Sequence, residues 1–160
     1  MTIVGLRRGH CLAGVSAVVS SVIAKHTTRA VKALKIHCPV DDAMLNMLSA
    51  GQLPAIDPDS ALAKILDIVR AENPLGDFGV YKSVVELGSG WELFTSDAAA
   101  RPALGQTGLE VASPTVILTI YIPMDAADDA VCRAIDAIVE AHPWEVPVIE
   151  ISETVLVTRV

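Results

Sequence analysis

The chain has 160 residues, of which 52% are hydrophobic, and it carries a formal net charge of −7. This length suits one domain with a sizeable core, and two each of Phe, Tyr and Trp leave that core to aliphatic side chains. No apolar run approaches the roughly 20 residues that cross a bilayer, so we expect a soluble protein without a membrane span. Cys11, Cys38 and Cys132 lack metal-finger spacing, which indicates free thiols in a reducing compartment.

The charge is distributed unevenly along the chain. Residues 1–40 hold six basic side chains and no acidic one, whereas residues 41–160 hold the other six basic side chains and all 19 acids. Because phosphates bind to basic surfaces, the acidic bulk of the chain argues against nucleic acid as its partner.

Residues 1–28 combine Arg7 and Arg8 with an apolar, serine-dotted run that ends before Lys25. This pattern is typical of a targeting segment, and also of an ordinary helix with apolar residues three and four positions apart. We predict a retained N-terminal helix over 1–28 and one domain over 29–160. The expected compartment is the cytoplasm; if the segment is targeting-derived, the alternative is the mitochondrial matrix or a membrane-associated complex.

Three segments follow the basic lead. Alternating apolar and polar residues over 30–40 predict a strand that stops at Pro39. Residues 41–50 start with acids and have helical spacing of apolar residues, which predicts a short helix. Residues 51–60 contain two prolines and a glycine, so we expect an exposed loop.

The middle of the chain predicts a helix and a hairpin. The helix covers 61–72, and Asp59 or Ser60 offers its N-terminal cap. Two strands, 79–87 and 91–95, flank the tight turn expected at the glycines of residues 88–90.

The last third predicts a long loop over 96–114 and an apolar, β-branched central strand over 115–123. The clearest helix of the chain covers 125–142, with Asp125 as its cap. A final strand or strand pair covers 146–160. The predicted order is strand, helix, strand, strand, helix, strand, which is the α+β, ferredoxin-like split βαβ plan, with two helices on one face of an antiparallel sheet.

Three short motifs carry a family resemblance that extends from about residue 30 to residue 152. They are "GVYKS", "RPALGQTG" and "AHPWEVPVIEI". In these motifs the sequence resembles the small insertion domain, also found free-standing, of the NGG-interacting-factor-three family. It is similar too to the CutA divalent-cation tolerance family, which shares the fold. The matching positions are Gly79, Tyr81, Pro102, Gly105, Gly108 and the run 142–147, with Trp144 where tyrosine is usual.

The resemblance implies a ferredoxin-like fold and, from the CutA relatives, a trimer linked to metal tolerance. Full-length members of the first family resemble dinuclear-metal hydrolases whose ligands lie in a larger surrounding domain, to which nothing here corresponds. The sequence departs from the family in its N-terminal helix and in the loop at 49–58. The resemblance therefore places no catalytic residue on this chain.

His142 and Glu145 form the most suggestive polar pair. One His and one Glu are half of a zinc site, and the prolines around them indicate a turn rather than one helix face. We therefore interpret Pro143, Trp144 and Pro147 as a structural joint that directs the last strand, with a subunit contact as a further role. Ligand or metal binding by His142 and Glu145 is the alternative.

Three glycines of the family motifs, Gly79, Gly105 and Gly108, are interpreted as turn glycines, since "GQTG" lacks the Lys-Ser/Thr of a phosphate-binding loop. No nucleophile motif occurs, so no catalytic residue is assigned.

The sequence favours a non-enzymatic, oligomeric protein that binds an ion, a small ligand or a protein partner, and that could serve as an accessory subunit of a larger assembly. A homotrimer is the favoured state. The alternative is a metal-dependent, hydrolase-related or divalent-cation tolerance protein. No cofactor is expected, and a divalent metal ion is the one exception kept open.

Overall fold

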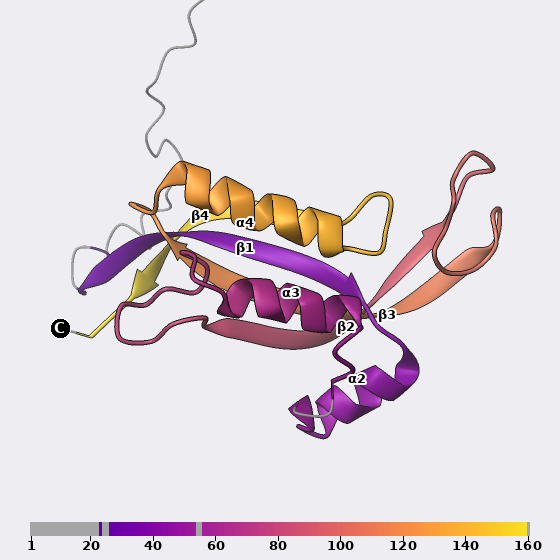
Figure 1. Cartoon of the computed structure of the whole chain (residues 1–160), viewed down its shortest axis with the longest axis horizontal. Helices are drawn as coiled ribbons and strands as arrows, with labels where there is room; N and C mark the ends of the chain where they lie inside the picture. The colour runs from indigo at the N-terminus through magenta and orange to yellow at the C-terminus, as the bar shows by residue number, and fades with distance from the viewer. Residues whose placement is uncertain (1–22, 24–25, 54–55, 160) are drawn as a thin grey trace, which may run out of the picture. The chain divides into compact units, whose positions relative to one another are not determined.

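The computed structural model describes residues 23, 26–53 and 56–159 of the chain (Figure 1). The predicted helix over 1–28 lies almost entirely outside these residues and stays a prediction. The chain divides into two compact units, Met1–Arg29 with Val155–Val160, and Ala30–Thr154. In the first unit the backbone N–H of Thr158 donates to the carbonyl of Thr27 over 2.8 Å. The second unit holds the features on which the functional argument rests.

Four strands and three helices make up the described fold. They are β1 (Thr28–Pro39), α2 (Asp42–Ser49), α3 (Ala61–Arg70), β2 (Val85–Thr95), β3 (Glu110–Pro123), α4 (Asp128–Ala141) and β4 (Ile149–Val157). The strands form one sheet in the order β2-β3-β1-β4, and β3 runs antiparallel to both β1 and β2. The predicted α+β class is confirmed, and this order of strands is consistent with a ferredoxin-like arrangement.

The core lies between one face of the sheet and the helices α3 and α4, which pack against each other. Alternate residues of β1 and β3 point toward these helices, because side chains alternate across a strand. Leu34 and Ile36 of β1 lie opposite Ile120 and Leu118 of β3, and all four are fully buried. The aliphatic core expected from the composition is therefore present.

The N-terminal cap predicted for α3 is present, whereas the one predicted for α4 is not. The Ser60 hydroxyl accepts a hydrogen bond from the N–H of Ala63 over 3.1 Å, so the cap predicted for α3 is confirmed. Asp125 does not cap α4. That helix begins three residues later, after Ala127, without a side-chain cap, and Asp128 and Asp129 occupy its first turn. The favourable interaction of these acids with the helix dipole replaces the missing cap.

The predicted hairpin around residues 88–90 is wrong. Gly88 and Gly90 belong to one continuous strand, β2, and lie opposite Ile117 and Thr115 of β3. A Cβ at Gly90 would come within 3.2 Å of the Ile117 side chain. The absent side chain therefore makes room for a cross-strand neighbour instead of turning the chain. The true turn lies between Thr95 and Glu110.

The hairpin of β2 and β3 extends beyond the end of β1 (Figure 1). Pro39, the last residue of β1, lies opposite Thr115, whereas the pairing of β2 with β3 continues to Thr95 and Glu110. We call this extension, residues 91–95 and 110–114, the hairpin arm. A two-stranded ribbon of this kind is marginally stable without further contacts.

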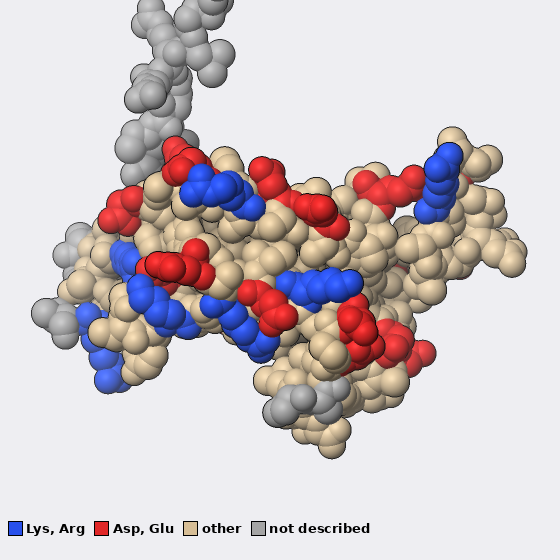
Figure 2. All heavy atoms as spheres, viewed as in Figure 1, with Lys and Arg blue, Asp and Glu red and all other residues tan. Residues whose placement is uncertain are grey.

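Acidic and basic side chains are mixed over the helices on the face that Figure 2 shows, and neither sign forms a large patch there. Among the described residues, no helix combines the length and the apolar character needed to cross a bilayer.

Cys38 predicts a dependence of stability on alkaline pH. Burial raises the pKa of its thiol from 9.0 to about 12, so the folded chain keeps this proton at a pH where the unfolded chain has lost it. Because the unfolded state then binds fewer protons, the free energy of unfolding should fall by up to about 1.4 kcal/mol per pH unit between the two pKa values.

Chemical denaturation from pH 8 upward would measure this slope. In Cys38→Val the contribution should vanish, whereas in Cys132→Ser, which changes an exposed thiol, it should persist. A parent and a Cys38→Val variant with parallel pH dependences above pH 9 would contradict the expectation.

Candidate functional site

His142 ends α4 and connects it to the middle of the sheet. Its Nε2 lies 2.8 Å from the carbonyl oxygen of His37 on β1, and its Nδ1 accepts a hydrogen bond from the N–H of Trp144 over 3.2 Å. Since Nδ1 accepts, the ring proton is on Nε2 and is donated to the carbonyl. Both ring nitrogens of this 6% exposed side chain are thus engaged with backbone. Neither ring nitrogen is available to a metal or a substrate proton.

Glu145 also holds backbone rather than facing His142 as a partner. Its Oε2 accepts a hydrogen bond from the N–H of Arg101 over 2.8 Å and thereby joins the β2–β3 loop to the segment before β4. Pro143 is exposed and Pro147 is half-buried. Pro143, Trp144 and Pro147 lie between α4 and β4, and their interpretation as a joint stays a prediction.

Trp144 packs against two rings. Its indole meets Phe94 at a centroid distance of 5.6 Å and His142 at 5.8 Å, and both contacts are edge-to-face. Such aromatic pairs are worth about 0.5–1.5 kcal/mol beyond the area that they bury. The indole is half-buried, because one side faces a pocket.

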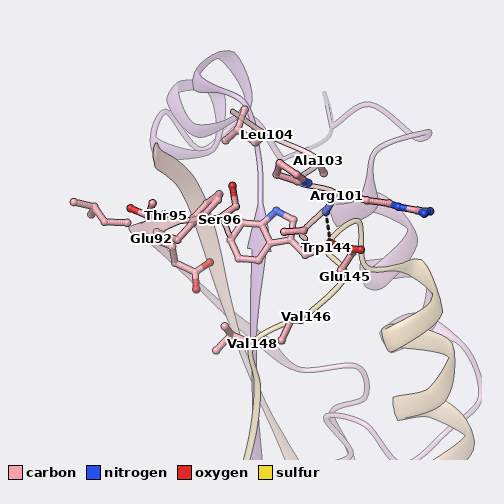
Figure 3. A pocket seen from close by; sticks show the side chains of 14 residues that line it. Glu92, Thr95, Ser96, Arg101, Ala103, Leu104, Trp144, Glu145, Val146 and Val148 are labelled. Carbon is pink, nitrogen blue, oxygen red and sulfur yellow. Dashed lines mark hydrogen bonds between the residues drawn. The ribbon is translucent and has the colours of Figure 1, made fainter. Parts of the chain in front are cut away.

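This pocket, which we call the Trp144 pocket, has a volume of about 460 Å³. Residues 92–96, residues 100–104, residues 144–146 and Val148 line it. Figure 3 shows the indole of Trp144 in the middle of these side chains, between the end of β2, the β2–β3 loop and the segment that leads into β4. The volume and the mostly apolar lining with a few polar groups are typical of small-molecule sites.

Glu92 links the Trp144 pocket to a polar cluster on the sheet face away from the helices. One carboxylate oxygen accepts a hydrogen bond from the hydroxyl of Thr115 over 3.3 Å, and the other lies 3.4 Å from Nδ1 of His37. Glu150 lies 3.9 Å from Nε2 of the same ring and pairs with Lys35 at 3.3 Å. Contacts with Thr115 and His37 therefore hold the Glu92 side chain, which is only 20% exposed.

His37 and Cys38 point to opposite faces of β1, as adjacent strand residues must. Cys38 lies in the core beneath the helices, and His37 lies in the polar cluster. Across residues 23, 26–53 and 56–159, no three His, Cys, Asp or Glu side chains are grouped so that they could hold a metal ion.

The predicted turn glycines all have positive φ, with values of 82° at Gly79, 79° at Gly105 and 78° at Gly108. A Cβ at Gly105 would collide with the side chain of Val111, so this position also needs glycine for space. Two of the three, Gly105 and Gly108, lie in the loop that contributes to the Trp144 pocket wall.

The sequence did not point to Glu92, Phe94, Ser96 or Arg101. These residues belong to the segment where the hairpin was wrongly predicted or to the loop after it. Arg101 contacts Glu145, 44 positions away, and Phe94 contacts Trp144, which is still more distant in the chain. The surroundings of Glu92 depend on the pairing of β2 with β3. The one local signal is Glu92 itself, a carboxylate among the apolar residues of "WELF". Because successive side chains of a strand point to opposite faces, it indicates that Glu92 lies on another face than Trp91 and Leu93.

No protein-family model matches the chain, and no curated protein matches it. Among solved structures, the crystal structure of a Bacillus cereus protein related to NIF3 is similar, with a TM-score of 0.52 and 14% identity over 80% of this chain. The chain spans 26% of that protein's length. At this identity the likeness concerns the fold alone, and it agrees with the resemblance of the sequence motifs to the NGG-interacting-factor-three family.

Proposed function

We propose that this chain is a non-catalytic, ferredoxin-like binding protein that works as a closed ring of identical copies, with a trimer favoured as in the CutA relatives that its sequence resembles. The observation that carries the proposal is that both edge strands of the sheet present exposed apolar side chains. On β2, Leu93 is 65% exposed and Trp91 is 56% exposed; on β4, Ile151 is 55% exposed. Open apolar edges are a liability unless another strand covers them.

The two edges differ, which favours a ring. Contact between β2 of one copy and β4 of the next uses two different surfaces, and such a heterologous contact generates a closed ring or an open filament. It would also add strand pairing to the hairpin arm, where β2 is the edge strand of the sheet.

The geometry of the joint supports a role other than catalysis. An acid–base pair needs at least one group free to exchange a proton with a substrate. His142 uses both ring nitrogens on backbone atoms, and Glu145 holds the N–H of Arg101. We infer that the chain has a binding role within a larger assembly, in the cytoplasm or in an organelle.

Sedimentation velocity of the parent and of three lysine variants tests the ring. The parent should sediment as an oligomer at micromolar concentration. Ile151→Lys and Leu93→Lys each place a charge on one edge and should give monomers, whereas Val139→Lys, on the outer surface of α4, should assemble like the parent.

A mixture of the two edge variants gives a sharper result. Each variant keeps one intact edge, so a heterologous contact predicts a dimer that contains one copy of each variant. A parent that is monomeric, or edge variants that assemble like the parent, would contradict the proposal.

A further inference from the structure

The Trp144 pocket combines aromatic rings with carboxylates. Phe94 and Trp144 present an apolar wall, and the carboxylates of Glu92 and Glu145 belong to the same lining. The one basic side chain of the lining is Arg101, and its guanidinium is directed away from the indole (Figure 3). Because the whole chain carries a net charge of −7, long-range attraction adds to this local preference for positive charge.

The carboxylate of Glu92 is held in position to accept a hydrogen bond from a ligand. Its carboxylate is held by the hydroxyl of Thr115 and lies beside the ring of His37, so little side-chain freedom would be lost on binding. A positive charge near an aromatic face gains further from the negative potential of the ring.

We propose that the Trp144 pocket binds a small organic cation, in which an ammonium group lies at the carboxylate of Glu92 and an apolar body packs against Trp144 and Phe94. This inference rests on the proposed function, since it names the ligand class of the binding protein described above.

Tryptophan fluorescence can test the proposal directly. The chain has two tryptophans, so a Trp91→Phe background leaves Trp144 as the reporter. Three compounds share a phenylethyl skeleton and differ in charge: phenethylamine, 2-phenylethanol and 3-phenylpropionate. We expect a saturable change with phenethylamine at millimolar concentration or below, binding about tenfold weaker for the alcohol, and the weakest binding for the carboxylate.

Variants then assign the site. Glu92→Gln should reduce the affinity for phenethylamine about tenfold, to that of the alcohol. Arg133→Gln, which removes an exposed charge of α4 outside the pocket lining, should not weaken binding. If Glu92→Gln does not fold, Glu145→Gln replaces it, with a severalfold loss expected.

Equal affinities for the amine and the carboxylate, unchanged affinity in the pocket variants, or no saturable change in the parent would overturn the proposal. Sedimentation of the parent chain, in which Trp91 is intact, separates this failure from that of the proposed function. An assembled protein that ignores phenethylamine refutes the ligand class alone, whereas a monomeric protein refutes the ring.

Discussion

His142→Ala is expected to lower the free energy of unfolding by about 2–4 kcal/mol, because it removes two hydrogen bonds from a buried site and leaves a cavity between α4 and β1. The N–H of Trp144 loses its acceptor, and the carbonyl of His37 loses a donor. Chemical denaturation of the parent and the variant measures the loss.

Two further variants make this result specific. His142→Asn can still accept from the N–H of Trp144 through its side-chain oxygen, so it should recover part of the loss. His26→Ala, which changes an exposed histidine, should stay within about 0.5 kcal/mol of the parent. If His142→Ala unfolds at the same denaturant concentration as the parent, the histidine is not a structural link and its role at the joint is wrong.

Trp144→Ala is expected to cost about 2–3 kcal/mol in the free energy of unfolding. This is below the range of about 3–5 kcal/mol for fully buried aromatic side chains, because the indole is only half-buried. The loss should come from the contacts with Phe94 and His142. Thermal and chemical unfolding would both report it.

The neighbouring Val146 provides the control for Trp144. It lies in the same segment but is 81% exposed, so Val146→Ala should change stability by no more than about 0.5 kcal/mol. Trp144→Phe should keep part of the ring contact and fall between the two. Equal stabilities of Trp144→Ala and Val146→Ala would show that the joint depends on its backbone and prolines alone.

Local signals were sufficient for the order of elements. The Ser60 cap, the helical spacing of α3 and α4 and the apolar run of β3 each depend on residues a few positions apart, and all three elements are present. The glycines at 88 and 90 failed as local signals, since their role is set by the side chain of Ile117 on another strand.

The site could be predicted only in part for the same reason. The prolines and Trp144 stand within one short motif, so the sequence could indicate a joint there, and that interpretation stays a prediction. The hydrogen bond of His142 reaches the carbonyl of His37, 105 positions earlier, and the hydrogen bond from the N–H of Arg101 to Glu145 joins two segments of the Trp144 pocket lining. Contacts of this kind depend on the topology of the sheet, which no single motif encodes.

Amide hydrogen exchange at the outer edge of β4 tests the central claim, a ring of copies joined through the sheet edges, most directly. The N–H of His37 donates to the carbonyl of Val148, and in an antiparallel pair such bonds involve every second residue. The N–H groups of Ile151 and Glu153 therefore point away from β1, toward the edge. In a ring they bond to another copy, so their exchange should be slow at high protein concentration and faster on dilution and in Leu93→Lys. Fast exchange of these two amides at every concentration, beside slow exchange at Glu150 and Ser152, would contradict the account.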